Sequence, residues 1–139
     1  MNRIIAAGCI SLALTGSALA QELTMSPDDA VAYIVSPATG DVVSNPVTVV
    51  FGLRGMGVAP AGIEKANTGH HHLLIDTELP LMDEPIPANA NHVHFGGGQT
   101  EVQLDLVPGE HSLQLLLGDV NHIPHDPPVY SEKVTVTVE

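Results

Sequence analysis

The histidines are the residues of this sequence best suited to chemistry. The chain has 139 residues, with eight histidines but only four lysines and arginines in total. Seven of the histidines fall in three short groups, and His111 stands apart. The groups are His70-His71-His72, His92-Val93-His94, and His122 with His125. Because alternate residues of a β-strand share a face, His70 with His72, and His92 with His94, are each predicted to present two imidazoles in one direction.

Clustered imidazoles favour a transition-metal site. Neutral imidazole suits zinc, copper and nickel, whereas the single cysteine and the scattered methionines argue against a thiolate or methionine-rich site. We therefore favour Cu(II) or Zn(II) as the bound ion. The predicted ligands are His70, His72, His92, His94, His122 and His125, with Asp119 as a supporting acid and with His71 and His111 as weaker candidates. Six histidines exceed the four ligands of one zinc ion, so some would orient other ligands or bind a second ion.

Three functions can use such a cluster. The one we favour is a non-enzymatic metal-binding domain that serves as a metal chaperone, buffer or sensor. The second is a metal-dependent enzyme, in which three histidines hold the ion and leave a position open for water or oxygen. The third is a structural or adhesion module, whose histidines form hydrogen bonds and whose surface binds a protein partner. A pH switch is a further use, because imidazole titrates near neutral pH.

Short apolar runs at period two, bounded by turn residues, predict an all-β fold. No helix is predicted, and residues 59–66 have at most one helical turn. Six or seven short strands without helical crossovers are typical of an immunoglobulin-like antiparallel β-sandwich. The predicted strands are 31–35, 47–53, 72–76, 102–106, 113–117 and 134–138.

This topology predicts that the histidine groups meet at one rim of the sandwich. Residues 70–72 open the third strand, His92 and His94 precede the fourth, and residues 119–125 follow the fifth. In an immunoglobulin-type sandwich these positions lie at the same end. Nearby prolines are expected to stiffen the third group before any ion binds.

Two leucines complicate the sheet that would carry the site. If Leu73 faces the core, His71 shares its side and Leu74 faces outward. Leu116, on the neighbouring strand, would likewise be an apolar residue that faces outward. Either the excursion over residues 77–91 covers both leucines, which we favour, or Leu74 and Leu116 form an apolar patch for a partner protein or a second copy of the chain.

The amino-terminal residues are typical of a cleavable export signal. Arg3 precedes an apolar stretch that is too short for a retained membrane span, and small residues end at Ala20. We predict a signal peptide over residues 1–20 and one periplasmic or secreted domain over residues 21–139, with no membrane attachment after cleavage. Lipidation of Cys9, which follows Ala-Ala-Gly, is the alternative.

The charge of the predicted mature domain argues against nucleic acid as a partner. Residues 21–139 hold all 16 acidic residues and three of the four basic ones, so 3 positive charges against 16 negative ones give −13. Phosphate contacts need basic residues. Divalent cations are therefore the expected small partners.

Four segments of the sequence resemble a known family. They are Gly69-His70-His71-His72-Leu73-Leu74-Ile75-Asp76, His94-Phe95-Gly96-Gly97-Gly98-Gln99-Thr100-Glu101, Pro108-Gly109-Glu110-His111-Ser112-Leu113-Gln114-Leu115, and the run from Gly118-Asp119 through His122, Pro124 and His125 to Pro128. Over residues 55–138 the chain resembles the uncharacterised bacterial family catalogued as domain of unknown function 4399, found in exported proteins. The resemblance implies that the histidine grouping is a family feature, and it implies no established activity. It also argues against an otherwise natural interpretation of His111 as an ordinary surface residue.

His92-Val93-His94 is also similar to the His-x-His pair of copper-zinc superoxide dismutase. The predicted mature chain has no cysteine, and no segment of it aligns with the zinc loop of that enzyme. The similarity therefore rests on this pair alone.

Overall fold

The structure is a computed structural model, and it describes residues 22–139. The predicted signal peptide, its cleavage site and Cys9 lie outside these residues. The described residues contain no helix, and residues 59–66 consist of turns and irregular backbone. None of these residues belongs to a helix long and apolar enough to cross a bilayer.

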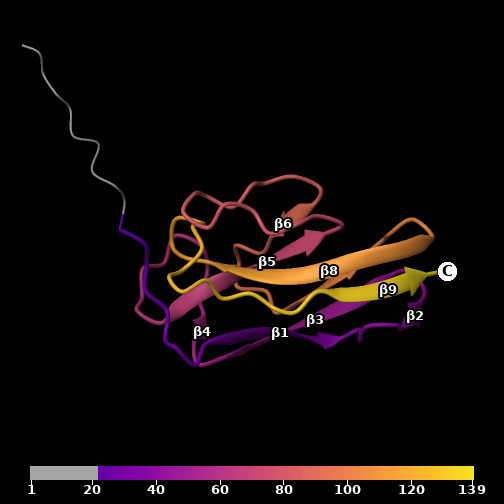
Figure 1. The fold of residues 1–139 in the computed structure, drawn as a ribbon, viewed down its shortest axis with the longest axis horizontal. Coiled ribbons are helices and arrows are strands. Elements are labelled where there is room, and N and C mark those ends of the chain that lie inside the picture. The colour runs from indigo at the N-terminus through magenta and orange to yellow at the C-terminus, as the bar shows by residue number, and fades with distance from the viewer. Residues whose placement is uncertain (1–21) are drawn as a thin grey trace, which may run out of the picture.

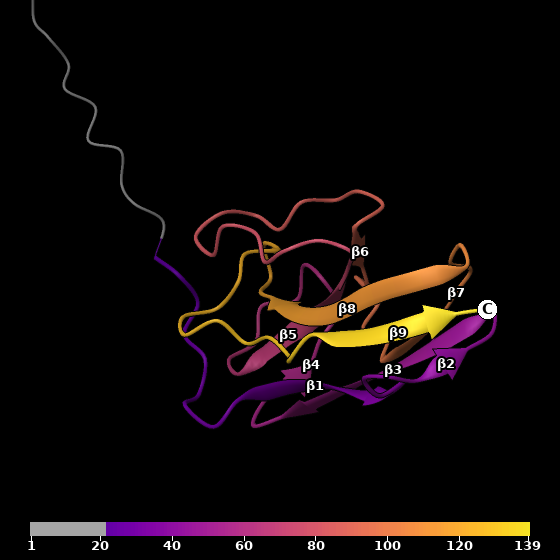
Figure 2. The ribbon, with the colours of Figure 1, turned by 45° about the vertical axis from the view of Figure 1, so that its right-hand side comes forward.

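Nine strands in the described part of the chain form two sheets (Figures 1 and 2). They are β1 (Val31–Ser36), β2 (Val42–Val43), β3 (Val47–Arg54), β4 (Gly57–Val58), β5 (Thr68–Ile75), β6 (His92–His94), β7 (Glu101–Leu104), β8 (Gly109–Gly118) and β9 (Val134–Val138). The smaller sheet has the order β1-β3-β7. The larger sheet has the order β2-β9-β8-β5-β4, with β6 paired to β5.

The observed architecture confirms the prediction of an all-β sandwich. The six predicted strands correspond to β1, β3, β5, β7, β8 and β9. The first, second and fourth of them form the smaller sheet, and the other three are adjacent in the larger one, which is the partition of an immunoglobulin-type sandwich. The short strands β2, β4 and β6 were not predicted as strands, because two or three residues carry too little alternation to be recognised.

Alternating apolar residues on the two inner faces form the main core. Val49 of β3 is 0% exposed, as are Leu113, Leu115 and Leu117 of β8. Burial of each such side chain contributes about 1.5–3 kcal/mol. This core fixes the register of the larger sheet, since a slip by one residue would turn every side chain of a strand to the opposite face.

A second apolar cluster lies on the outer face of the larger sheet. Leu74 and Leu116 are 1% and 0% exposed, and they form this cluster with Ile86, which is also buried. Leu79 and Met82 pack against it. The excursion between β5 and β6 therefore covers both leucines, so neither is exposed to a partner.

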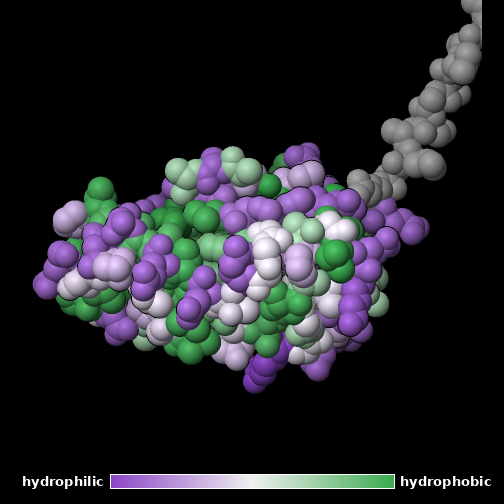
Figure 3. Space-filling model, turned by 180° about the vertical axis from the view of Figure 1, so that it is seen from behind, coloured by the Kyte–Doolittle hydropathy of each residue, from purple (hydrophilic) through white to green (hydrophobic). Residues whose placement is uncertain are grey.

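Exposed apolar side chains elsewhere include Val31, Tyr33 and Val35, which share one face of β1. Val35 and Val107 are more than half exposed, and seen from behind the molecule shows hydrophobic groups interrupted by hydrophilic side chains (Figure 3).

Candidate metal centre

The pleat of β5 turns its three consecutive histidines to opposite sides of the larger sheet. All three are 1% exposed. His71 lies on the core side with Leu73, and its ring centroid is 5.2 Å from that of Phe51. His70 and His72 lie on the outer face, where their ring centroids are 4.8 Å apart.

Strand β6 adds a further imidazole to this outer face. It pairs antiparallel with β5, and His94 stands opposite His72 in the register. The ring centroid of His94 lies 4.9 Å from that of His70 and 5.1 Å from that of His72. His94 therefore reaches the cluster through strand pairing, and not from a loop at the rim as the sequence predicted.

The loop after β8 supplies His122. Its ring centroid lies 5.0 Å from that of His70 and 4.7 Å from that of His94. The backbone of His122 is left-handed, with φ of 66°, a conformation that few residues with side chains adopt. One histidine from each of the three groups thus meets at one place on the outer face.

Three of these imidazoles are spaced as a metal site requires. One nitrogen from each of His70, His94 and His122 lies within 4.8 Å of the other two. His70 is buried, His122 is half-buried and His94 is exposed, so the cluster opens to solvent on one side. The Nε2 atom of His70 is buried without a hydrogen-bond partner in the described chain. An unpaired buried nitrogen among imidazoles fits a bound metal ion, because an ion would satisfy it.

Burial keeps the inner imidazoles of the cluster neutral. Burial, followed by the nearby imidazoles of His122 and His94, lowers the pKa of His70 to about 4. Burial and the surrounding imidazoles likewise lower the pKa of His72 to about 3. The pKa of His94 is also lowered, first by burial and then by His122. Neutral imidazole is the form that binds a metal ion.

Glycines make room for three of the histidine rings, of which that of His94 belongs to the triad. A Cβ on Gly118 would lie 2.7 Å from Cε1 of His72, and one on Gly96 would overlap the ring of His94. A Cβ on Gly69 would likewise lie 2.9 Å from Cε1 of His125. Each of these glycines lies in a segment that also contains histidines. Glycines beside histidines are therefore a sequence signal that the backbone approaches the rings closely.

The structure places the remaining predicted ligands outside the triad. His72 lies beside it, and its Nδ1 is buried without a partner in the described chain. Nδ1 of His92 lies 2.9 Å from Oδ1 of Asn89. Nε2 of His125 lies 3.2 Å from the carbonyl oxygen of Thr68, and burial lowers the pKa of this imidazole. His92 and His125 are thus held by neighbours of their own, whereas the ring of His72 borders the triad.

Asp119 is a structural acid of the loop. Its Oδ1 accepts hydrogen bonds from the backbone N–H groups of Asn121 and Ile123, at 2.8 and 2.9 Å. Its Oδ2 accepts a bond of 2.6 Å from the Thr24 hydroxyl. The sequence offers a signal for the turn, because in the order Asp-x-Asn the aspartate often accepts a bond from the backbone N–H two residues ahead. It offers no signal for Thr24, which sequence reasoning missed.

His71 belongs to the core, and its replacement by leucine is expected to stabilise the protein. Neither ring nitrogen of His71 has a hydrogen-bond partner among residues 22–139, and burial lowers its pKa to about 4. His71→Leu removes this unsatisfied polar group from an apolar setting, so the free energy of unfolding should rise by about 1–3 kcal/mol. Urea denaturation at pH 7.5 measures the change. Loss of bound metal in this variant would instead identify His71 as a ligand.

His111 is a structural histidine near the start of β8. Its Nδ1 lies 2.7 Å from Oδ2 of Asp76, and its Nε2 lies 2.7 Å from the carbonyl oxygen of Val107. The bond to Val107 and then that to Asp76 raise its pKa. Both partners are acceptors, so the protonated ring, which donates from both nitrogens, fits best.

This geometry predicts a pH-dependent contribution from His111. Because its pKa is raised in the folded state, its stabilisation is complete below the ordinary value near 6.5 and is lost as the pH rises through the raised folded value. His111→Gln should therefore lower the free energy of unfolding by about 1–3 kcal/mol at pH 5.5 and by less at pH 8.5. Urea denaturation of both proteins at both pH values isolates the effect. An equal loss at both values would contradict the protonated assignment.

Comparison with known proteins places the chain in a family. No curated protein matches it, and no solved structure matches it. Residues 49–139 match a family described as Domain of unknown function (DUF4399). This range contains all eight histidines. The match confirms the resemblance seen in the sequence, and the chain belongs to the DUF4399 family.

Proposed function

We propose that this protein is an exported metal-binding domain that holds Cu(II) or Zn(II) on His70, His94 and His122. The observation that carries the proposal is the spacing of three ligand nitrogens from three separate segments, all within 4.8 Å of one another. The buried Nε2 of His70, which has no hydrogen-bond partner among residues 22–139, supports it. Bound metal would give the three imidazoles a Lewis-acidic partner, and the residues of the site would fix its position.

A role as a metal chaperone, buffer or sensor suits the exposure of the site. His94 lies at the surface on a short edge strand. An ion held there can be exchanged with solvent or with another protein, whereas a structural zinc site is closed by four protein ligands. Export to the periplasm is part of the proposal, and it rests on the amino-terminal signal pattern.

The test is the metal content of tag-free protein purified from the periplasm, measured by mass spectrometry. Near-stoichiometric copper or zinc, absent from a His70→Ala/His122→Ala variant, would support the proposal and name the ion. Absence of retained metal, together with no submicromolar uptake on titration with either ion, would overturn it. Circular dichroism of the variant is the control, since a folded variant shows that the ligands and not the fold were lost.

A metal-dependent enzyme is the second candidate, favoured by the open side of the triad. Three histidines and a position accessible to solvent are the arrangement of catalytic zinc sites. Azide added to the Cu(II)-loaded protein should shift its visible absorption if a position is open. An unchanged spectrum would exclude this candidate. The superoxide dismutase-like pair receives no support, because His92 contacts Asn89 and the triad contains only His94.

A further inference from the structure

The amino-terminal segment of the described chain lies along the loop that carries His122. The backbone N–H of Asp126 donates to the carbonyl oxygen of Thr24 at 2.9 Å, and the N–H of Ser26 donates to the carbonyl oxygen of Asp126 at 3.0 Å. The Ser26 hydroxyl donates to the carbonyl oxygen of Pro127 at 2.6 Å. Residues 24–26 thus form a short parallel pairing with the loop.

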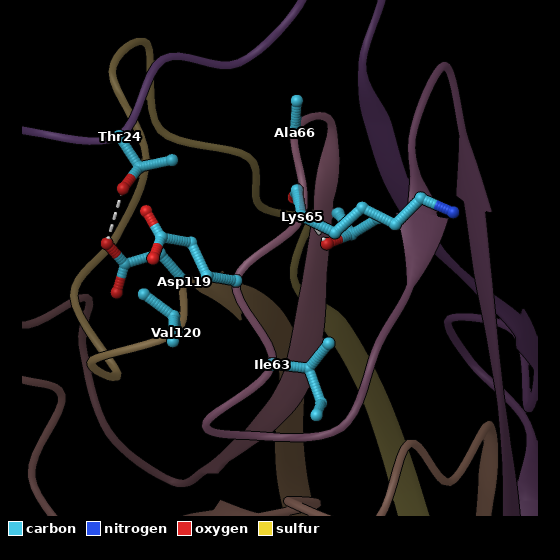
Figure 4. Close-up of a pocket in the computed structure, with 8 residues that line it drawn as sticks. Thr24, Ile63, Lys65, Ala66, Asp119 and Val120 are labelled. Atoms are coloured by element: carbon cyan, nitrogen blue, oxygen red, sulfur yellow. Dashed lines mark hydrogen bonds between the residues drawn. The ribbon is translucent and has the colours of Figure 1, made fainter.

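Hydrogen bonds, more than apolar packing, hold this segment in place. Met25 is 65% exposed. A cavity of about 210 Å³ lies beside the segment and is lined by Thr24, Ile63 and Asp119 among others. Figure 4 shows Thr24 directed at the Asp119 carboxylate across the edge of this cavity, with Ile63 on the opposite side.

Asp119 connects the segment to the loop. It is 3% exposed, and its two oxygens accept three hydrogen bonds, one from the Thr24 hydroxyl and two from the backbone N–H groups that flank His122. Three of the roughly four acceptor positions of the carboxylate are thus used within the protein. Asp119 is therefore suited to fixing the loop.

The backbone of His122 is held on both sides. Its N–H donates to the carbonyl oxygen of Asp119 at 3.0 Å, and its carbonyl oxygen accepts a bond of 2.8 Å from the N–H of Ile86. Its left-handed φ of 66° is unfavourable for a residue with a side chain, so surrounding bonds must maintain it. The Asp119 carboxylate supplies two such bonds to the adjacent residues.

We propose that Thr24 and Asp119 form a latch that docks the amino-terminal segment and sets His122 in its metal-binding position. Asp119 is a positioning residue that acts through His122, and Thr24 acts through Asp119. This inference rests on the proposed metal site for its functional meaning, but the latch itself is a property of the chain without metal. The amino-terminal segment is accordingly a part of the site, although it contributes no ligand.

The first test needs no metal. Thr24→Val removes the hydroxyl at nearly constant size, and Thr24→Ser retains it. Hydrogen exchange should show at least about tenfold faster exchange of the Asn121 and Ile123 amides in Thr24→Val, with protection restored in Thr24→Ser. Unchanged protection in Thr24→Val would overturn the latch. The amides of β3, which lies in the other sheet, are the internal reference, since global destabilisation would accelerate their exchange as well.

The second test asks whether the latch acts through His122. Zn(II) affinity should fall about 10–100-fold in Asp119→Ala, the range for residues that orient a ligand. Asp119→Asn, which keeps an acceptor oxygen, should recover most of it. In a His122→Ala background, Asp119→Ala should add no further loss, because the ligand that it positions is absent.

Multiplicative losses in the double variant would overturn the proposed action through His122. Absence of Zn(II) and Cu(II) binding to the unmodified protein would instead overturn the proposed function, while the exchange experiment still decides whether the latch exists. The two failures are therefore distinguishable.

Discussion

His94→Ala is expected to lower the affinity for Zn(II) by about 100-fold or more. Its imidazole is one of three whose nitrogens lie within 4.8 Å of one another, and loss of a direct ligand should exceed the 10–100-fold cost of altering a residue that only orients one. Competition with a zinc-sensitive dye at pH 7.5 measures the change. The fold should be retained, because His94 is exposed and lies on an edge strand.

His92→Ala is the matched control for this experiment. It lies two residues away on the same short strand, and its position in the register is opposite Leu74. Because its Nδ1 contacts Asn89, its loss should change the Zn(II) affinity less than about threefold. Equal losses in both variants would show that the pair acts together, and the assignment of the triad would then be wrong.

Leu116→Ala is expected to cause the largest loss of stability among the changes considered. Leu116 is 0% exposed and forms the outer cluster with Leu74 and Ile86. Truncation removes buried methyl groups and leaves a cavity, which costs about 2–5 kcal/mol in the free energy of unfolding. Urea denaturation of the metal-free protein measures this cost.

Val107→Ala provides the comparison, since Val107 is 72% exposed and its truncation should change stability by less than about 0.5 kcal/mol. A loss below about 1 kcal/mol in Leu116→Ala would mean that the excursion between β5 and β6 does not cover this leucine in solution.

Most strands of the sandwich were predictable from apolar residues at period two, which alternate with polar residues most clearly in β7 and β9. The third predicted strand was placed at residues 72–76, but β5 begins at Thr68 and ends at Ile75. Histidines on its buried outer face hide the alternation, since His70 and His72 are polar residues at buried positions. The apolar pattern therefore underestimates the length of a strand wherever polar side chains are buried on one of its faces.

The convergence of the histidine groups was predictable from topology, but its geometry was not. A rim was expected, whereas the pairing of β6 with β5 places His94 on the outer face of the sheet. Three residues of edge strand leave no periodic signal. The roles of His92 and His111 were also hidden, because their partners Asn89 and Asp76 become neighbours only through turns and sheet pairing.

The consecutive histidines of β5 also matter before the chain has folded. In the native sheet the pleat directs His71 into the core, away from His70 and His72. In the denatured ensemble no pleat separates these side chains, so an ion could contact neighbouring imidazoles of the tripeptide without tertiary structure. An ion that binds the unfolded chain offsets part of the stabilisation that it gives to the native state. If the proposed metal site binds an ion, the net stabilisation of the fold would thus be smaller than the affinity of the folded site alone implies.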